Sequence, residues 1–291
     1  MKSNRMESRA ARAETARETL EILKKGSYTG PGNKEVALSE AMDFAVKNSQ
    51  LITPEMEGEL EEKLQEVLSE TGQKPKSVIE VTDETTLAAA RRLVQQEGFP
   101  KVVCLNFASA VNPGGGFLDG SSAQEESIAR ATGLYPCIAQ FNVMYETNRK
   151  YRSALYTDHM IYSPQVPVFR DDRDQLLEQP FFVSIITAPA VNAGVVKSRE
   201  PHNIPRIEEV MVTRIGKILA VAAVYRYDAL VLGAYGCGVF QNNPTDVAGY
   251  FARFLGPGGR FENVFRHVTF AVPEKGRSKH NHHVFKEVLS F

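Results

Sequence analysis

The chain has 291 residues, which is enough for one large α/β domain or for one domain with a helical extension. Its net charge is −1, with 43% hydrophobic and 24% charged residues, so the charge balance does not indicate a protein that binds nucleic-acid duplexes. No apolar run approaches the ~20 residues that span a bilayer, and the charged start lacks the apolar core of a secretory signal.

The three cysteines indicate a protein of a reducing compartment. Cys104, Cys137 and Cys237 are widely spaced and form no CxxC pair. Neither a disulfide framework nor a zinc site is expected, and a reducing compartment is the default. We therefore expect a soluble, cytoplasmic protein that makes no direct membrane contact and binds no specific nucleic-acid sequence.

The first part of the chain is predicted to be mainly helical. Patterns and capping residues indicate helices at 10–25, 39–48 and 53–71, with a turn-rich connector at 27–33. We interpret residues 1–75 as an N-terminal extension packed on a main domain that comprises residues 76–291.

From residue 77 onward, predicted strands alternate with predicted helices. Strands are predicted at 77–82, 101–107, 181–186, 229–232 and 268–272, and helices at 84–97, 127–144 (broken at Pro136), 207–225, 243–255 and near the C-terminus. Residues 159–169 alternate too, but Pro164 and Pro167 indicate an edge strand or an extended segment. This order predicts an α/β fold of three layers, in which a mixed, partly parallel sheet is flanked by helices on both faces.

One stretch stands out, because three glycines and two acids follow the strand at 101–107. Asn112-Pro113-Gly114-Gly115-Gly116 is followed, after seven residues, by Gln124-Glu125-Glu126. Consecutive glycines at a strand-to-helix junction expose main-chain N–H groups that attract phosphates, whereas the acids repel an anion. The combination suits a ligand that is both phosphorylated and chemically attacked, such as a nucleotide-sugar. The alternative is a glycine-rich turn with acids that open a helix.

A second glycine loop follows the strand at 229–232. It reads Gly236-Cys237-Gly238-Val239-Phe240 and fits neither the P-loop nor the GxGxxG fingerprint. Its N–H groups could still hold a diphosphate, and Phe240 could contact a base or ribose; a plain turn with Phe240 in the core is the alternative. Both loops lie at carboxyl ends of predicted strands, where ligands bind in such sheets.

No metal site is expected. Near the C-terminus stand His280, His282 and His283, but no carboxylate or thiol lies at ligand spacing, so we interpret them as a surface tail. There is no GxSxG elbow for a serine hydrolase.

The first motif resembles the signature of the poly(ADP-ribose) glycohydrolases, three glycines followed six to eight residues later by Gln-Glu-Glu. Residues 233–240 are similar to the diphosphate-binding loop of that family, and the likeness, to the compact bacterial and fungal type, spans about 77–255. The resemblance implies a macrodomain-like fold, with ADP-ribose or poly(ADP-ribose) as ligand and ADP-ribosylated proteins as partners. It also implies hydrolysis of the ribose–ribose bond, mainly from chain ends, in ADP-ribosylation reversal and the DNA damage response. No cofactor is implied.

The resemblance also implies roles for single residues. Glu126 would be the general acid and base, Glu125 would hold ribose hydroxyls, and Asn112 would bind a distal ribose hydroxyl. Gly114, Gly115, Gly116 and Gln124 would also bind substrate, and the N–H groups from Gly236 to Phe240 would hold the diphosphate.

Two expectations concern the carboxylates themselves. Neighbouring side chains on a helix project about 100° apart, so the two carboxylates are not expected to face each other or to straddle one bond. We also expect bound substrate, rather than the empty protein, to set the protonation state of Glu126. For adenine, the strand end at 80–82 is a first hypothesis.

Three other classes of function remain open at this point. The chain could be a catalytically silent ADP-ribose reader, or a hydrolase of another ADP-ribosyl linkage, on a protein side chain or a nucleobase. A nucleotide-dependent oxidoreductase is a more distant alternative, because neither glycine loop fits it.

Overall fold

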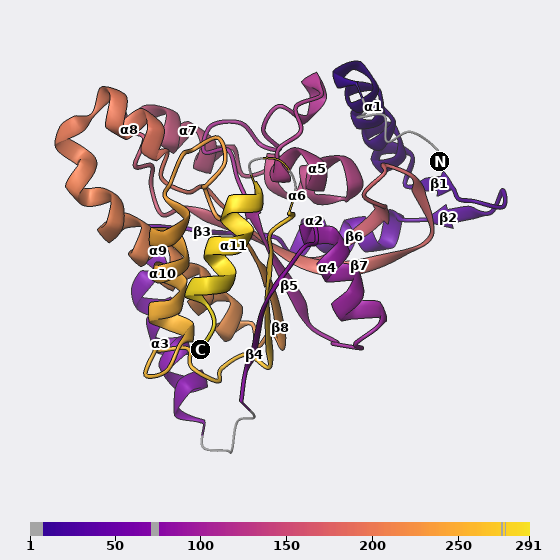
Figure 1. Ribbon diagram of the computed structural model, residues 1–291. Coiled ribbons are helices and arrows are strands. Elements are labelled where there is room, and N and C mark those ends of the chain that lie inside the picture. Colours follow the sequence, from indigo (N-terminus) through magenta and orange to yellow (C-terminus); the bar gives the residue numbers. More distant parts are fainter. Residues whose placement is uncertain (1–7, 71–75, 275, 277) are drawn as a thin grey trace.

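The computed structural model describes residues 8–70, 76–274, 276 and 278–291 (Figure 1). Within these residues the main sheet has seven strands, in the order β3-β6-β7-β5-β8-β9-β4. The strands are β3 (Gln50–Ile52), β4 (Val78–Thr82), β5 (Val102–Phe107), β6 (Met160–Arg170), β7 (Leu176–Ala188), β8 (Ala229–Leu232) and β9 (His267–Ala271). A separate hairpin joins β1 (Ser27–Thr29) to β2 (Glu35–Ala37).

The sheet is mixed, and its parallel part carries the glycine loops. The neighbours β7, β5, β8, β9 and β4 all pair in parallel, whereas β6 is antiparallel to both β3 and β7. The carboxyl ends of the five parallel strands therefore lie along one edge of the sheet. Both glycine loops leave the sheet at that edge, after β5 and after β8.

Helices cover both faces of the sheet, which gives the three layers that the sequence predicts (Figure 1). The first face is packed by α3 (Glu57–Ser69), α8 (Ala193–Arg199), α9 (Ile207–Val224), α10 (Pro244–Leu255) and α11 (Ser278–Val288). The second is packed by α2 (Ser39–Asn48), α4 (Thr86–Gln95), α5 (Gln124–Ala131), α6 (Leu134–Ala139) and α7 (Asn142–Lys150). Short 3-10 helices are η1 (Pro54–Met56), η2 (Phe117–Asp119) and η3 (Pro201–Arg206).

Strand β5 shows why the apolar runs are continuous. Val103 and Leu105 pack into the first face, whereas Val102 and Cys104 pack into the second, because successive side chains of a strand alternate. With both faces covered, every one of these positions is buried, so the strand reads as a continuous apolar run.

The N-terminal part differs from its predicted form in two places. The connector predicted at 27–33 contains the first strand of the β1–β2 hairpin, and residues 50–52 form β3, which joins the main sheet beside β6. Helix α1 (Arg9–Lys25) is as expected: Ser8 accepts the N–H of Ala11 at its start, and Gly26 ends it in a left-handed conformation. Glu57–Ser69 forms the third predicted helix, after η1.

Two expectations based on proline were wrong. Pro136 lies inside α6, and the predicted helix at 127–144 is instead divided at Thr132-Gly133 and near Phe141. Strand β6 lies between β3 and β7 rather than at the sheet edge. Pairing with β3 extends only from Met160 to Tyr162, so Pro164 and Pro167 stand where no β3 partner needs their missing N–H. In the described part of the chain, no helix is both long and apolar enough to cross a bilayer.

Candidate active site

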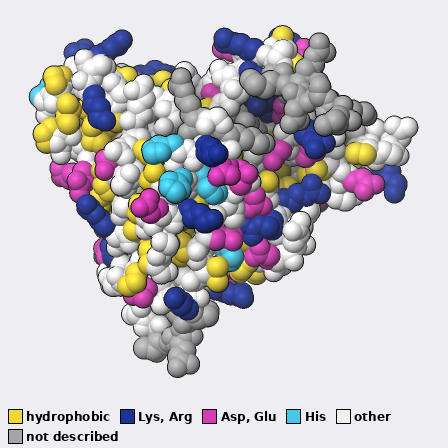
Figure 2. All heavy atoms as spheres, viewed as in Figure 1, with side chains coloured by type: hydrophobic (Ala, Val, Ile, Leu, Met, Phe, Trp, Pro, Cys, Tyr) yellow, Lys and Arg dark blue, Asp and Glu magenta, His cyan; other side chains and the backbone are white. Residues whose placement is uncertain are grey.

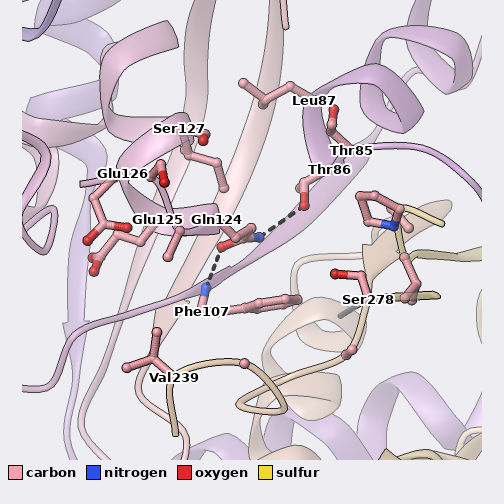
Figure 3. A pocket seen from close by; sticks show the side chains of 18 of the residues that line it. Thr85, Thr86, Leu87, Phe107, Gln124, Glu125, Glu126, Ser127, Val239 and Ser278 are labelled. Carbon is pink, nitrogen blue, oxygen red and sulfur yellow. Dashed lines mark hydrogen bonds between the residues drawn. The ribbon is translucent and has the colours of Figure 1, made fainter. Parts of the chain in front are cut away.

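A pocket of about 550 Å³ opens at the carboxyl edge of the parallel strands. Its volume lies within the ~300–1,000 Å³ range of small-molecule sites. Of the residues that the sequence singles out, Gln124, Glu125, Glu126, Gly236, Gly238, Val239 and Phe240 line it. Other lining residues include Thr86, Phe107, Ser109, Ser122, Pro273, Ser278 and Asn281 (Figure 3).

The first glycine loop folds back over the start of α5. Gly114 and Gly115 have φ values of +72° and +59°, which a residue with a side chain rarely adopts. A Cβ atom on Gly115 would stand 2.5 Å from Glu126 Oε1 and 3.1 Å from Glu125 Oε2. The glycine is therefore needed because both carboxylates press against the loop backbone.

The two carboxylates consequently meet, although adjacent positions on a helix led us to expect them apart. Both tips converge on Gly115, because the loop folds over the end of the helix, where no earlier turn separates them. Figure 3 shows the two groups together on one side of the pocket. The prediction that the two carboxylates would not face each other was therefore wrong for their oxygen atoms, although the two side chains leave the helix backbone in different directions.

Glu126 is held by one oxygen only. Its Oε1 accepts the N–H of Gly116 at 3.0 Å. Its Oε2 is buried and has no hydrogen-bond partner among the described residues, and the side chain is 9% exposed. A buried carboxylate oxygen without a partner is costly, so Glu126 keeps an unused acceptor beside the pocket.

Glu125 is held more firmly and more deeply. Its Oε2 accepts the N–H of Ser109 at 2.6 Å, and its Oε1 lies 3.4 Å from Asn106 Nδ2. Burial, together with the charge of Glu126, raises the pKa of Glu125 to about 8 against the lowering effect of the Ser109 N–H. Near neutral pH the empty site therefore keeps a proton on Glu125.

Gln124 joins the helix to the sheet. Its Oε1 accepts the N–H of Phe107 at 2.8 Å, and its Nε2 donates to Leu105 O at 2.8 Å and to Thr86 Oγ1 at 3.0 Å (Figure 3). Both amide hydrogens are thus committed within the protein. Gln124 fixes the position of α5, and with it the two neighbouring carboxylates.

The two glycine loops use their N–H groups differently. In the first loop the N–H groups of Gly115, Gly116 and Phe117 all have acceptors within the protein, Asn112 O, Glu126 and Gly114 O. In the second, the N–H groups of Gly238, Val239 and Phe240 have no acceptor among the described residues. The second loop is therefore the one that offers donors to an anion.

The second loop is anchored from below. Gly236 has a φ of +72°, and Asn242 Nδ2 donates to Gly236 O at 3.0 Å and to Val191 O at 2.8 Å. The ring of Phe240 packs 6.1 Å from that of Tyr156, while Val239 at the tip is 77% exposed. The tip therefore stands over the pocket on a fixed base.

Several residues that the sequence singles out lie outside the pocket lining. Asn112 is exposed, and Gly114, Gly115 and Gly116 touch the pocket only through the carboxylates that they support. The thiol of Cys237 packs toward the core, and burial raises its pKa to about 12. Glu80, from the strand end suggested for adenine, is instead paired with Arg92 at 2.6 Å.

Sequence reasoning missed the residues beneath the carboxylates. Asn106 and Ser109 stand at the end of β5, so their position at the carboxyl edge was a usable signal. No sequence signal pointed to Tyr145 of α7. This residue is fully buried, and its hydroxyl has no partner among the described residues. Burial, and then the charge of Glu125, raises the pKa of Tyr145.

The C-terminal histidines do not form the surface tail that we expected. They lie on α11, where His282 is buried with Nδ1 2.8 Å from Val272 O, while His280 and His283 are exposed. Among the described residues no three His, Cys, Asp or Glu side chains are grouped so as to hold a metal ion.

Comparisons with known proteins give a consistent result. The family model "Microbial-type PARG, catalytic domain" matches residues 16–171. The crystal structure of poly(ADP-ribose) glycohydrolase (PARG) from Thermomonospora curvata is 43% identical, with a TM-score of 0.90, over 96% of this chain and 100% of that one. Its complex with the inhibitor ADP-HPD matches with a TM-score of 0.86 at 43% identity, over 96% of this chain and 99% of that one.

A second organism gives the same match. PARG from Deinococcus radiodurans in complex with ADP-ribose is 44% identical, with a TM-score of 0.77, over 85% of this chain and 96% of that one. A comparison with curated proteins gave no match. The family model covers more than half of the sequence, and the crystal structures extend the likeness to 85–96% of it. The chain therefore belongs to the family of microbial-type poly(ADP-ribose) glycohydrolases.

Proposed function

We propose that the chain hydrolyses the ribose–ribose O-glycosidic bonds of poly(ADP-ribose) and releases ADP-ribose, mainly from chain ends. One observation carries the proposal: two buried carboxyl groups meet at one side of the pocket, and unused N–H groups of a glycine loop line the other. Family membership supports it, since the relatives in complexes hold ADP-ribose or ADP-HPD. ADP-ribosylated proteins would be the macromolecular partners, and the intracellular location expected from the cysteines stays a prediction.

The diphosphate would bind the second loop. The N–H groups of Gly238, Val239 and Phe240 supply three donors for its anionic oxygens, and these donors cost no rearrangement because Asn242 already fixes the loop. The negative diphosphate would then lie close enough to favour the cationic transition state at the ribose.

Glu126 would be the general acid and base. In the forward step its proton passes to the 2′-oxygen of the leaving ribose while the bond from that oxygen to the anomeric carbon breaks. The resulting oxocarbenium ion is attacked by water, whose proton returns to Glu126. The unpartnered Oε2 supports this assignment, because the other oxygen is already fixed by Gly116.

Glu125 would hold the sugar and share the proton of the pair. Two adjacent carboxylates cannot easily both ionise in a buried site, which favours a proton on Glu125. The raised pKa of Glu125, about 8, supports that arrangement in the empty protein. Two added phosphate charges would favour proton uptake by the pair, and the role of substrate in setting the state of Glu126 stays a prediction.

The test compares two substrates and one variant. The protein is incubated with purified poly(ADP-ribose) and with mono-ADP-ribosylated protein, and free ADP-ribose is measured. We expect release from the polymer; release only from the mono-modified protein would indicate another linkage. Glu126→Gln should abolish hydrolysis while ADP-ribose binding persists, and undiminished hydrolysis by that variant would overturn the assignment of Glu126.

A further inference from the structure

Beside the first glycine loop lies a strongly basic surface. Six exposed cationic side chains lie on α7, on α8 and in the segments that follow them: Arg149, Lys150, Arg152, Lys197, Arg199 and Arg206. We name this the α7–α8 surface. Figure 2 shows dark blue side chains over this part of the molecule.

The surrounding charges do not neutralise it. Residues 142–159 and 193–206 contain three acids, Glu146, Asp158 and Glu200, so six positive charges against three negative ones leave an excess of three, in a chain whose net charge is −1. Each acid has a partner of its own: Glu146 accepts from Asn142 Nδ2 at 2.6 Å, and Glu200 accepts from Ser153 Oγ at 2.6 Å and from the N–H of Ala154 at 2.8 Å. Asp158 pairs with Arg214 at 2.9 Å.

The two halves of the surface are joined by side chains. Glu200, which follows Arg199, bonds Ser153, which follows Arg152, so the basic ends of α7 and α8 come together (Figure 1). Asn203 of η3 donates to Glu200 at 2.9 Å and lies 3.4 Å from Ser153 Oγ. The cations therefore belong to one continuous surface.

This surface reaches the loop beside the carboxylates. Arg149 donates to the carbonyl of Val111 from Nη2 at 2.6 Å and from Nε at 3.0 Å. Val111 immediately precedes the exposed Asn112, to which the family resemblance assigns a distal ribose hydroxyl. The surface thus begins next to the loop against which both carboxylates rest.

The surface also carries an exposed aromatic ring. Tyr151, between Lys150 and Arg152, is 42% exposed. Cationic side chains interleaved with aromatic rings are how proteins track single-stranded, base-bearing polyanions. Each unit of poly(ADP-ribose) carries two phosphates and one adenine, so both the charge and the ring have a counterpart in the polymer.

We propose that the α7–α8 surface binds the units of poly(ADP-ribose) that lie beyond the one in the pocket. This inference rests on the proposed function. It predicts that long polymers are captured more tightly than short ones, because only long polymers reach the surface. The attraction is electrostatic and therefore salt-dependent.

The test is the double variant Lys197→Glu with Arg199→Glu, assayed on long polymer and on the dimer of ADP-ribose. Neither residue touches the pocket lining. We expect KM for long polymer to rise about three- to tenfold at low salt, and the difference from the parent protein to shrink at high salt. Kinetics on the dimer should stay within about twofold, because the dimer is too short to engage the surface.

The matched control is Lys24→Glu with Lys25→Glu, which makes the same change in net charge in the last turn of another helix, α1. It should leave KM for both substrates unchanged. A rise in KM that is equal for dimer and polymer, or that the control reproduces, would overturn the proposal.

Two further outcomes are distinct. If the parent protein releases no ADP-ribose from either substrate, the proposed function itself has failed, and the surface loses its assignment with it. If single-stranded RNA binds the parent as tightly as the polymer and loses that binding in the double variant, the surface belongs to nucleic acid and the proposal is wrong.

Discussion

Arg12 of α1 donates a 2.8 Å hydrogen bond to the carbonyl of Gly120, which stands 108 residues further along the chain. Arg9 reaches the adjacent carbonyl of Asp119 at 2.8 Å. These two bonds dock α1 on η2, the short helix that links the three glycines to the start of α5. The N-terminal helix thus helps to hold the loop against which both carboxylates rest.

Replacing both arginines should therefore reduce catalysis more than ligand binding. In Arg9→Ala with Arg12→Ala, we expect kcat to fall about 10- to 100-fold, because small displacements of acid groups are costly in rate. ADP-ribose affinity should change little, since the second glycine loop is untouched. Steady-state kinetics and calorimetric titration measure the two quantities.

The control for that variant lies on the same helix. Arg17 pairs with the exposed Glu14 one turn away and bonds neither η2 nor the glycine loop, so Arg17→Ala should leave kcat unchanged. Equal losses of kcat in both variants would show that α1 matters for stability alone and not for the position of the loop.

The docking of α1 also depends on Gly120. Its φ is +75°, and an added Cβ would stand 2.0 Å from Arg9 O. Gly120→Ala should destabilise the protein by about 2–4 kcal/mol, through strain and overpacking together. Gly32→Ala separates the two causes, because Gly32 has a φ of +84° with nothing within 4 Å. Denaturant unfolding of both variants checks this; equal destabilisation would remove the clash from the explanation.

The contact between α1 and Gly120 could not be predicted from the sequence, whereas other features of the fold could. The alternation of strands and helices, and the position of the Gln-Glu-Glu motif at a helix start, follow from local patterns. Arg12 and Gly120 have no local signal that joins them, since their contact depends on how the extension packs. For the same reason β3, only three residues long, was missed, and with it the inner position of β6.

The convergence of the two carboxylates could not be predicted from the sequence either. Helix geometry gives the directions in which Glu125 and Glu126 leave the backbone, and these directions differ. The loop that brings their tips together is set by Gly114 and Gly115 at positive φ. Which N–H groups are occupied also depends on this closure, so the sequence could not distinguish the first loop, which holds carboxylates, from the second.

Glu125 makes stability depend on pH. Its pKa is raised from 4.5 to about 8 in the folded protein, so between these values the folded state keeps a proton that the unfolded state has lost. Rising pH therefore lowers the free energy of unfolding, by at most about 1.4 kcal/mol per pH unit, and the loss is complete above the folded pKa. Glu125→Gln removes this contribution to the pH dependence of the free energy of unfolding.

The measurement is the difference in unfolding free energy between Glu125→Gln and the parent protein from pH 5 to pH 9. It should rise with pH in favour of the variant and level off above about pH 8. If the difference for Glu125→Gln does not change with pH, the carboxyl group of Glu125 is already ionised at pH 5.

Gly115→Ala tests the central feature of the site, the contact between loop and carboxylates. The new methyl group would stand 2.5 Å from Glu126 Oε1 and 3.1 Å from Glu125 Oε2, at a backbone φ of +59°. Both carboxyl groups must then move, so we expect kcat to fall about 100-fold or more. ADP-ribose should still bind, because Gly238, Val239 and Phe240 keep their donors. Gly98→Ala, with a φ of +71° and nothing within 4 Å, controls for backbone strain and should retain full activity. If Gly115→Ala were equally active, the carboxylates would be positioned by α5 alone, and the loop would be dispensable to them.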